Sequence, residues 1–115
     1  MARALLLVRS KPTTAQQEGE YNTWYDQVHL KDVLAIPGVV AASRYRLSEK
    51  QLALAADDAG RGYLAVYEIE AEDPQAVLAA LAAGGAEMQL SAAMEMDPPP
   101  ETAFFEEVTP RLSSD

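Results

Sequence analysis

Apolar residues in this chain gather into four short runs that are separated by two longer segments of mixed polarity. The runs cover residues 2–8, 39–47, 63–70 and 102–108. Each run has the length of a β-strand and is rich in aliphatic, β-branched or aromatic residues, so we predict four strands. In the third run, alternation places Tyr63 and Tyr67 on one face and Leu64 and Val66 on the other.

The segment between the first two runs has helical character. We predict a helix over residues 15–29, which residues 30–36 either continue or leave at a kink. Pro37 and Gly38 then end the helical region, because proline lacks the donor that a helix needs and glycine accepts the turn that follows.

A second helix is predicted after the third strand. Asp73 and Pro74 form a strong helix start, since the aspartate can cap the first turn and proline fits the first helical position. Gly84 and Gly85 end this helix. A short third helix is predicted over residues 86–96.

The order of these elements is β-α-β-β-α-β, which predicts a ferredoxin-like α+β fold with helices on one face of a four-stranded antiparallel sheet. We expect one domain over residues 1–115, with an ordered core over 1–112 and a tail over 113–115. Two helices cover only one face, yet the strands are apolar on both. The second face should therefore pack on another copy of the chain, giving a homodimeric barrel.

Composition narrows the classes of partner. Nine basic and eighteen acidic residues give a net charge of −9, which disfavours nucleic acid and anionic membranes. The apolar run near the N-terminus has about five residues, fewer than a signal peptide or a membrane span needs. The chain has no cysteine, which fits the cytoplasmic location that we expect.

Candidate chemistry concentrates in the first helix. Tyr21, Tyr25 and His29 are four residues apart and share one stripe of an α-helix, with Trp24 on the neighbouring stripe. His29 is the only histidine and Trp24 the only tryptophan of the chain. An aromatic helix that carries one imidazole and docks on a sheet is a plausible wall for a small-molecule pocket.

These residues resemble a known family. The segment 24–30 (WYDQVHL), the pairs 33–34 (VL), 37–38 (PG) and 44–45 (RY), and the segment 63–68 (YLAVYE) are similar to the EthD-like branch of the dimeric α/β-barrel superfamily. The superfamily includes monooxygenases, haem-degrading enzymes, polyketide cyclases, dehydratases and decarboxylases. The resemblance implies the ferredoxin-like fold and dimerisation. It also implies that the histidine of the Trp-x4-His motif, His29, faces a cleft between helix and sheet.

We predict catalytic roles for His29, Tyr25 and Tyr67. Imidazole titrates near neutral pH and can act as general acid and base, with Asp26 or Asp32 to orient it, while a tyrosine hydroxyl can stabilise developing oxyanion charge. Tyr67, like Tyr63, would point into the barrel if Leu64 and Val66 faced the helices. The alternative is that His29 packs or caps the helix and that the tyrosines belong to the core.

The predicted ligand contacts surround these three residues; they are Trp24, Tyr21, Tyr63, Arg44 and Tyr45. Arg44 and Arg46 share a strand face opposite Tyr45, and the sequence does not decide which face lines the cavity. Facing the cavity, the arginines suit an anionic or enolate ligand; facing solvent, they form an ordinary charge pattern of an edge strand.

Two functions remain open. The first is a cofactor-independent enzyme, of cyclase, dehydratase, decarboxylase or monooxygenase type, acting on a small apolar, aromatic or polyketide-like molecule. The second is a non-catalytic dimer that binds a hydrophobic metabolite. One histidine and no cysteine give little support to a haem or metal site, so we predict neither cofactor nor metal. No phosphate-binding loop or nucleophile elbow occurs.

Overall fold

A four-stranded antiparallel sheet with the strand order β2-β3-β1-β4 forms the centre of the molecule. The structure is a computed structural model that describes residues 1–53, 60–85, 88 and 90–114. The strands are β1 (Ala2–Ser10), β2 (Val39–Arg46), β3 (Tyr63–Ala71) and β4 (Glu101–Glu106). The predicted α+β, ferredoxin-like arrangement is confirmed, with strand ends that differ by a few residues from those predicted.

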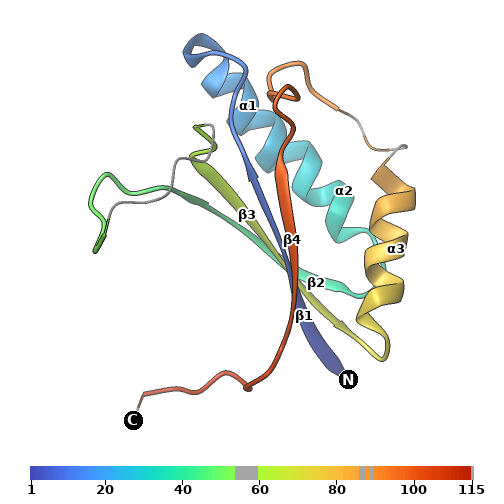
Figure 1. Cartoon of the computed structure of the whole chain (residues 1–115). Helices are drawn as coiled ribbons and strands as arrows, with labels where there is room; N and C mark the ends of the chain where they lie inside the picture. The colour runs from blue at the N-terminus through green and yellow to red at the C-terminus, as the bar shows by residue number, and fades with distance from the viewer. Residues whose placement is uncertain (54–59, 86–87, 89, 115) are drawn as a thin grey trace.

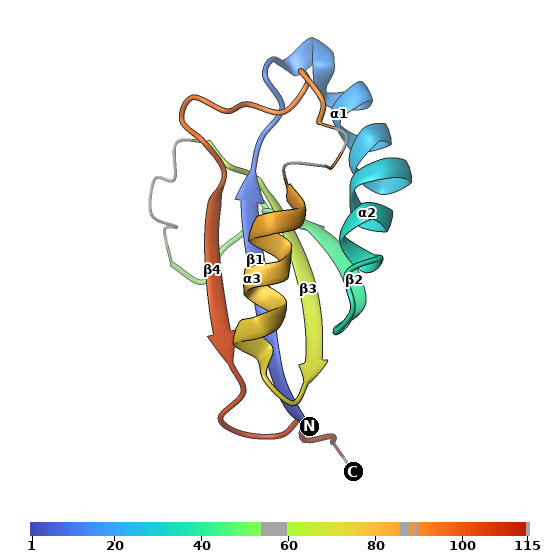
Figure 2. The same cartoon turned by 90° about the vertical axis from the view of Figure 1, so that its right-hand side faces the viewer.

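The described helices all lie on one face of the sheet (Figures 1 and 2). The first helical region changes type along its length, and it consists of the 3-10 turn η1 (Ala15–Gln17), the α-helix α1 (Glu18–Trp24), the π-helical turn η2 (Tyr25–His29) and the α-helix α2 (Leu30–Leu34). The helix α3 (Pro74–Gly84) follows β3. None of these helices has the length and apolar character needed to cross a bilayer.

The helix α3 begins and ends as its sequence predicts. The Asp73 carboxylate accepts a hydrogen bond from the Gln75 backbone amide, and Pro74 occupies the first helical position. The third helix predicted over residues 86–96 is wrong in the part that the structure describes. Residues 90–96 form turns and a bridge instead, because their backbone groups bond to the chain before η1; the Thr13 amide donates to the Ala93 carbonyl at 2.7 Å. Residues 86, 87 and 89 lie outside the described part.

The hydrophobic core fills the layer between the sheet and the helices. The register pairs Leu6 with both Tyr67 and Phe104, so these three side chains share the face that the helices cover. The buried apolar residues of this layer are Ala4, Tyr21, Trp24, Tyr25, Val33, Val39, Ala65, Tyr67, Ile69, Val77 and Ala93. The predicted alternation along β3 is confirmed.

The opposite face of the sheet, here called the open face, carries no helix in the described part of the chain (Figure 1). Its centre is apolar, and Leu5, Tyr45 and Phe105 are 38%, 58% and 54% exposed. Leu64 and Val66 face this side, because they pair with Tyr45 and Ser43 across the sheet. The two-sided apolar strands predicted from the sequence are therefore present. The dimer that would cover the open face stays a prediction.

Candidate functional site

The π-helical turn η2 organises the aromatic residues of the first helix. In an α-helix, residues five apart point about 140° away from each other, whereas a π-helix brings them onto one side. Trp24 and His29 are five apart, and their rings stack with centroids 4.8 Å apart and planes 19° apart. Tyr25 meets the same imidazole edge to face at 5.1 Å. The turn thus places the one histidine between two aromatic rings.

His29 is partly buried in this aromatic setting. Its Nδ1 is buried and has no hydrogen-bond partner among the described residues. Burial lowers the pKa of His29 below its usual value of 6.5, and the Asp32 carboxylate offsets part of this shift. The imidazole is therefore neutral at pH 7 and able to accept a proton. Asp26, also predicted to orient His29, binds Arg44 instead.

Three tyrosine rings and one serine form a buried polar cluster beside the imidazole. Ser10 at the end of β1 and the Tyr21 hydroxyl share a hydrogen bond of 2.5 Å. Burial raises the pKa of Tyr21, Tyr25 and Tyr67, so that all three hydroxyls stay protonated near neutral pH. The Tyr67 hydroxyl is buried and has no partner of hydrogen-bond geometry in the described part of the chain. The nearby Tyr25 hydroxyl adds to the rise in the pKa of Tyr67 that burial causes.

Arg44 is enclosed between β2 and the first helix. Its Nη1 donates to Asp26 Oδ1 and its Nη2 to Asn22 Oδ1, each at 2.8 Å, and only 12% of its side chain is exposed. Its guanidinium carbon lies 4.4 Å from the centroid of the Tyr25 ring and within 5.5 Å of the centroids of Tyr21 and Tyr63. The side chain is therefore not a solvent-facing charge, and its predicted contact with a ligand stays a prediction.

Tyr63 is tied to the start of α1. Its hydroxyl donates to Glu18 Oε2 and accepts a hydrogen bond from Asn22 Nδ2 at 3.4 Å. Its ring packs against Tyr21 with centroids 5.3 Å apart. We expect Tyr63 and Tyr67 to point into the barrel if Leu64 faces the helices. Leu64 lies on the open face instead, and the two tyrosines lie on the helix face.

The structure thus brings together seven of the eight predicted site residues in one layer, and they are Tyr21, Trp24, Tyr25, His29, Arg44, Tyr63 and Tyr67. Tyr45 is separate, since it lies on the open face. Ser10 and Asn22 also belong to the cluster and were missed by the sequence analysis. Ser10 can be recognised from the sequence, because it is a polar residue at a position where the alternation along the apolar strand points inward.

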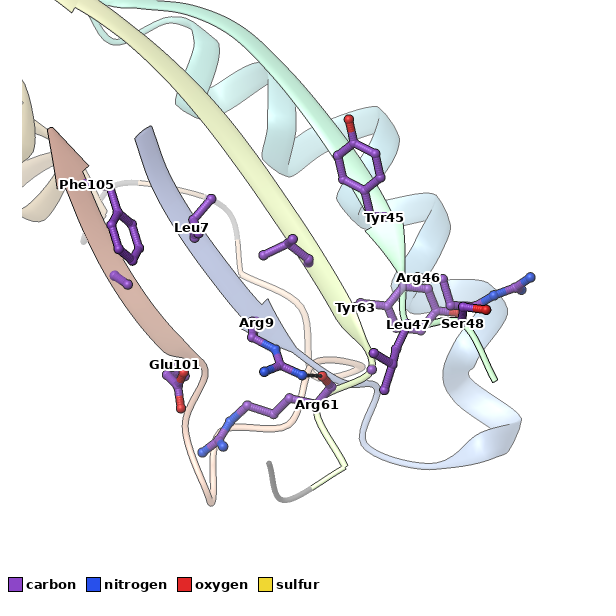
Figure 3. A pocket seen from close by; sticks show the side chains of 13 residues that line it. Leu7, Arg9, Tyr45, Arg46, Leu47, Ser48, Arg61, Tyr63, Glu101 and Phe105 are labelled. Atoms are coloured by element: carbon purple, nitrogen blue, oxygen red, sulfur yellow. Dashed lines mark hydrogen bonds between the residues drawn. The ribbon is translucent and has the colours of Figure 1, made fainter. Parts of the chain in front are cut away.

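None of three hollows on the described surface has His29, Tyr25 or Tyr67 in its lining, although Trp24 lines one of them and Tyr45 and Tyr63 line another. The first has a volume of about 490 Å³ and lies on the open face near the end of β1 (Figure 3). Leu7, Phe105 and Tyr45 form apolar walls there, and Arg9 donates to the Arg61 carbonyl at 3.3 Å. No three acidic, histidine or cysteine side chains converge as a metal site among the described residues.

Comparison with known proteins supports the fold. No family model matches the chain, and no curated protein matches it. The structure is similar to that of an ethyl tert-butyl ether D (EthD) family protein from Bacillus halodurans, with a TM-score of 0.59, 15% sequence identity and coverage of 94% of this chain and 100% of the other.

At lower TM-scores it is similar to two further structures. HapK from Hahella chejuensis has a TM-score of 0.49 and 16% identity, with both chains fully covered. A dimeric ferredoxin-like protein of unknown function from Thermobifida fusca has a TM-score of 0.47 and 18% identity, with 92% of each chain covered. The chain has an EthD-like, ferredoxin-like fold.

Proposed function

We propose that this chain is a cofactor-independent enzyme in which His29 acts as general acid and base on a small apolar molecule. One observation carries the proposal: the π-turn holds a neutral imidazole between the rings of Trp24 and Tyr25, and its buried Nδ1 has no hydrogen-bond partner among the described residues. Single π-turns occur often at functional sites. A polar atom left without a partner in an apolar layer is costly, and a catalytic role is one reason for which a protein retains it.

The neighbouring groups suit proton transfer. Neutral His29 takes a proton from the substrate, and the Asp32 carboxylate favours the imidazolium that results. The hydroxyls of Tyr25 and Tyr67 remain protonated and can donate to an oxygen that gains negative charge. These roles describe an enolising, cyclising, dehydrating or decarboxylating enzyme better than one that needs a nucleophilic side chain.

The proposed substrate is uncharged or weakly polar and aromatic or polyketide-like. The cationic group of the layer, Arg44, is held by Asp26 and Asn22 and by the faces of tyrosine rings. It therefore offers little uncompensated charge to an anionic ligand. The surrounding rings offer flat apolar surface, which favours stacking with a planar molecule.

We further propose that the chain works as a homodimer that is joined through the open face. Leu5, Tyr45 and Phe105 expose an apolar surface of the kind that a soluble monomer rarely leaves uncovered. An isologous pair of sheets would bury this surface from both copies at once.

A second candidate function is a non-catalytic dimer that binds a hydrophobic metabolite. It is favoured by the dense packing of the helix–sheet layer, where Tyr25 contacts His29 and is itself covered by the Arg44 guanidinium. A hollow beside this layer is lined by Trp24 and Val28, but His29 is not part of its lining. In this case His29 would contribute to packing, and a ligand would bind without being converted.

The test begins with a thermal-shift screen of small aromatic and polyketide-like compounds. Hits are then followed by proton NMR of the His29 ring, which gives unobstructed signals because it is the chain's only histidine. For an enzyme, His29→Ala and His29→Gln should each lower turnover of a converted hit by about 10²–10⁴-fold, with dimerisation unchanged. Binding and turnover that both survive in folded His29→Gln would overturn the catalytic role. Binding without conversion in the wild-type protein would favour the second candidate.

A further inference from the structure

The last residues of the chain form an extended tail that lies on the side of the open face. The Glu107 amide donates to the Arg3 carbonyl at 2.9 Å, which continues the pairing of β4 with β1 by one residue. Residues 108–114 then form neither helix nor strand. Figure 1 shows this tail leaving the sheet on the side opposite the helices. Val108 and Leu112 on the tail are 95% and 83% exposed, so two apolar side chains lack cover from the described part of the chain.

The two ends of the open face carry hollows of similar size and opposite charge. The first, of about 490 Å³, is lined by three arginines and one glutamate, a net charge of +2. The second, of about 500 Å³, lies between the sheet and the start of the tail and is lined by two arginines and four glutamates, a net charge of −2. Apolar residues such as Leu7 in the first and Leu5 in the second form their floors.

This charge pattern selects one of two ways to pair the open faces. A two-fold axis parallel to the strands would place like-charged ends together. An axis across the strands places the positive end of each copy against the negative end of the other, which is electrostatically favourable and limits the wrong pairing. In this second arrangement the tail, which starts at the negative end, projects toward the partner's positive hollow.

The reach of the tail is sufficient for this contact. The seven residues after Glu107, 108–114, span up to about 23 Å when extended. Arg3 and Arg9, which mark the two ends on β1, are separated by about 20 Å at the usual rise of a strand. The tail can therefore follow the partner's sheet for the length of one strand.

Building on the homodimer proposed above, we propose that residues 108–114, which follow the last residue paired with β1, are an exchanged arm. Val108 and Leu112 of each copy enter the other copy's positive hollow, next to Leu7 and Leu47. Apolar contact holds the arm, because the charges of its Arg111 and of the preceding Glu107 cancel. The occupant of this hollow (Figure 3) is thus the tail of a second copy of this chain, rather than a small molecule. The contact occurs twice in the dimer, because the interface is isologous.

Cysteine cross-linking tests the arm, since the chain has no cysteine of its own. A Leu112→Cys chain is mixed with a Leu47→Cys chain of distinguishable size, and the mixture is oxidised and separated on a non-reducing gel. The matched control pairs Leu112→Cys with Leu5→Cys, which lies at the negative end. We expect at least tenfold more mixed disulfide with Leu47→Cys, because a disulfide forms only between closely placed residues. An excess with Leu5→Cys, or no mixed disulfide with either chain, would overturn the proposal.

Dimer affinity gives an independent measurement. Deletion of residues 108–115, or Leu112→Asp, should raise the dimer dissociation constant by at least tenfold in analytical ultracentrifugation, whereas Ser113→Asp should change it less than threefold. An unchanged constant after the deletion would refute the arm and leave the open-face dimer standing. A wild-type protein that stays monomeric at micromolar concentration would refute the dimer and the arm together. Neither result depends on whether His29 is catalytic.

Discussion

The guanidinium carbon of Arg44 lies 4.4 Å from the centroid of the Tyr25 ring. This contact joins the edge strand β2 to the π-turn that carries His29. The same guanidinium is fixed by Asp26 and Asn22, both on the first helical region. Arg44 therefore connects the sheet to the helix at the point where the candidate site lies.

Replacement of Arg44 by methionine should reduce the free energy of unfolding by about 2–4 kcal/mol. The change removes a partly desolvated cation–π contact and the two hydrogen bonds that the charged guanidinium donates. Urea denaturation measures the effect. The matched control is Arg46→Met on the same strand, where the side chain is exposed, and it should cost less than about 0.5 kcal/mol. Equal effects at the two positions would contradict the role assigned to Arg44.

Removal of the Tyr67 hydroxyl should separate stability from function. Tyr67→Phe deletes a buried oxygen that has no hydrogen-bond partner in the described part of the chain, so the protein should keep its stability or gain up to about 1 kcal/mol. Tyr21→Phe should instead cost about 1–2 kcal/mol, because it leaves the buried Ser10 hydroxyl without its partner. If Tyr67→Phe also loses turnover of a converted compound, the hydroxyl has a catalytic task. A marked loss of stability in Tyr67→Phe would show that the hydroxyl has a structural partner.

The pKa of His29 makes stability depend on pH in a defined direction. Because burial lowers this pKa in the folded protein, the unfolded chain binds a proton more readily once the pH falls below about 6.5. The His29 contribution to stability is therefore complete above that pH, declines as the pH falls, and levels off below the folded pKa. NMR titration of the single imidazole should give a midpoint below 6.5.

The urea midpoint of the wild-type protein between pH 7 and pH 5 should accordingly fall more than that of His29→Gln. The difference between the two proteins isolates His29 from the carboxylates that titrate over the same range. A titration midpoint above 6.5 would mean that a negative charge, rather than burial, dominates at this position.

Gly38 should not accept a side chain. Its φ is +98°, and a β-carbon there would lie 2.5 Å from Cγ2 of Val77 on α3. We expect Gly38→Ala to cost at least about 2 kcal/mol of unfolding free energy, through backbone strain and displacement of α3. The control is Gly19→Ala in α1, where a β-carbon meets nothing within 4 Å and helix propensity should add about 0.5–1 kcal/mol. A neutral Gly38→Ala would show that α3 moves freely.

The sequence predicted the strands, their order and the aromatic stripe because these depend on periodicity and on local helix ends. Tyr21, Tyr25 and His29 do share one side, with ring centroids at 5.5 and 5.1 Å. The π-turn was not predicted, since no residue type in η2 requires it; it is recognisable only from the five-residue spacing of Trp24 and His29. The position of Arg44 depends on strand register and on distant partners, which a single sequence does not show.

The π-turn also has a consequence for how related chains should be aligned. Relative to an α-helix, η2 holds one additional residue without ending the helix. Loss of any one residue between Tyr25 and Val28 would restore regular winding and leave the tryptophan and the histidine four apart, a spacing that an α-helix keeps on one side. Among homologues, a one-residue gap in this short interval would therefore be compatible with the stacked pair, because a four-residue spacing in an α-helix and a five-residue spacing across a π-turn both bring the two rings together.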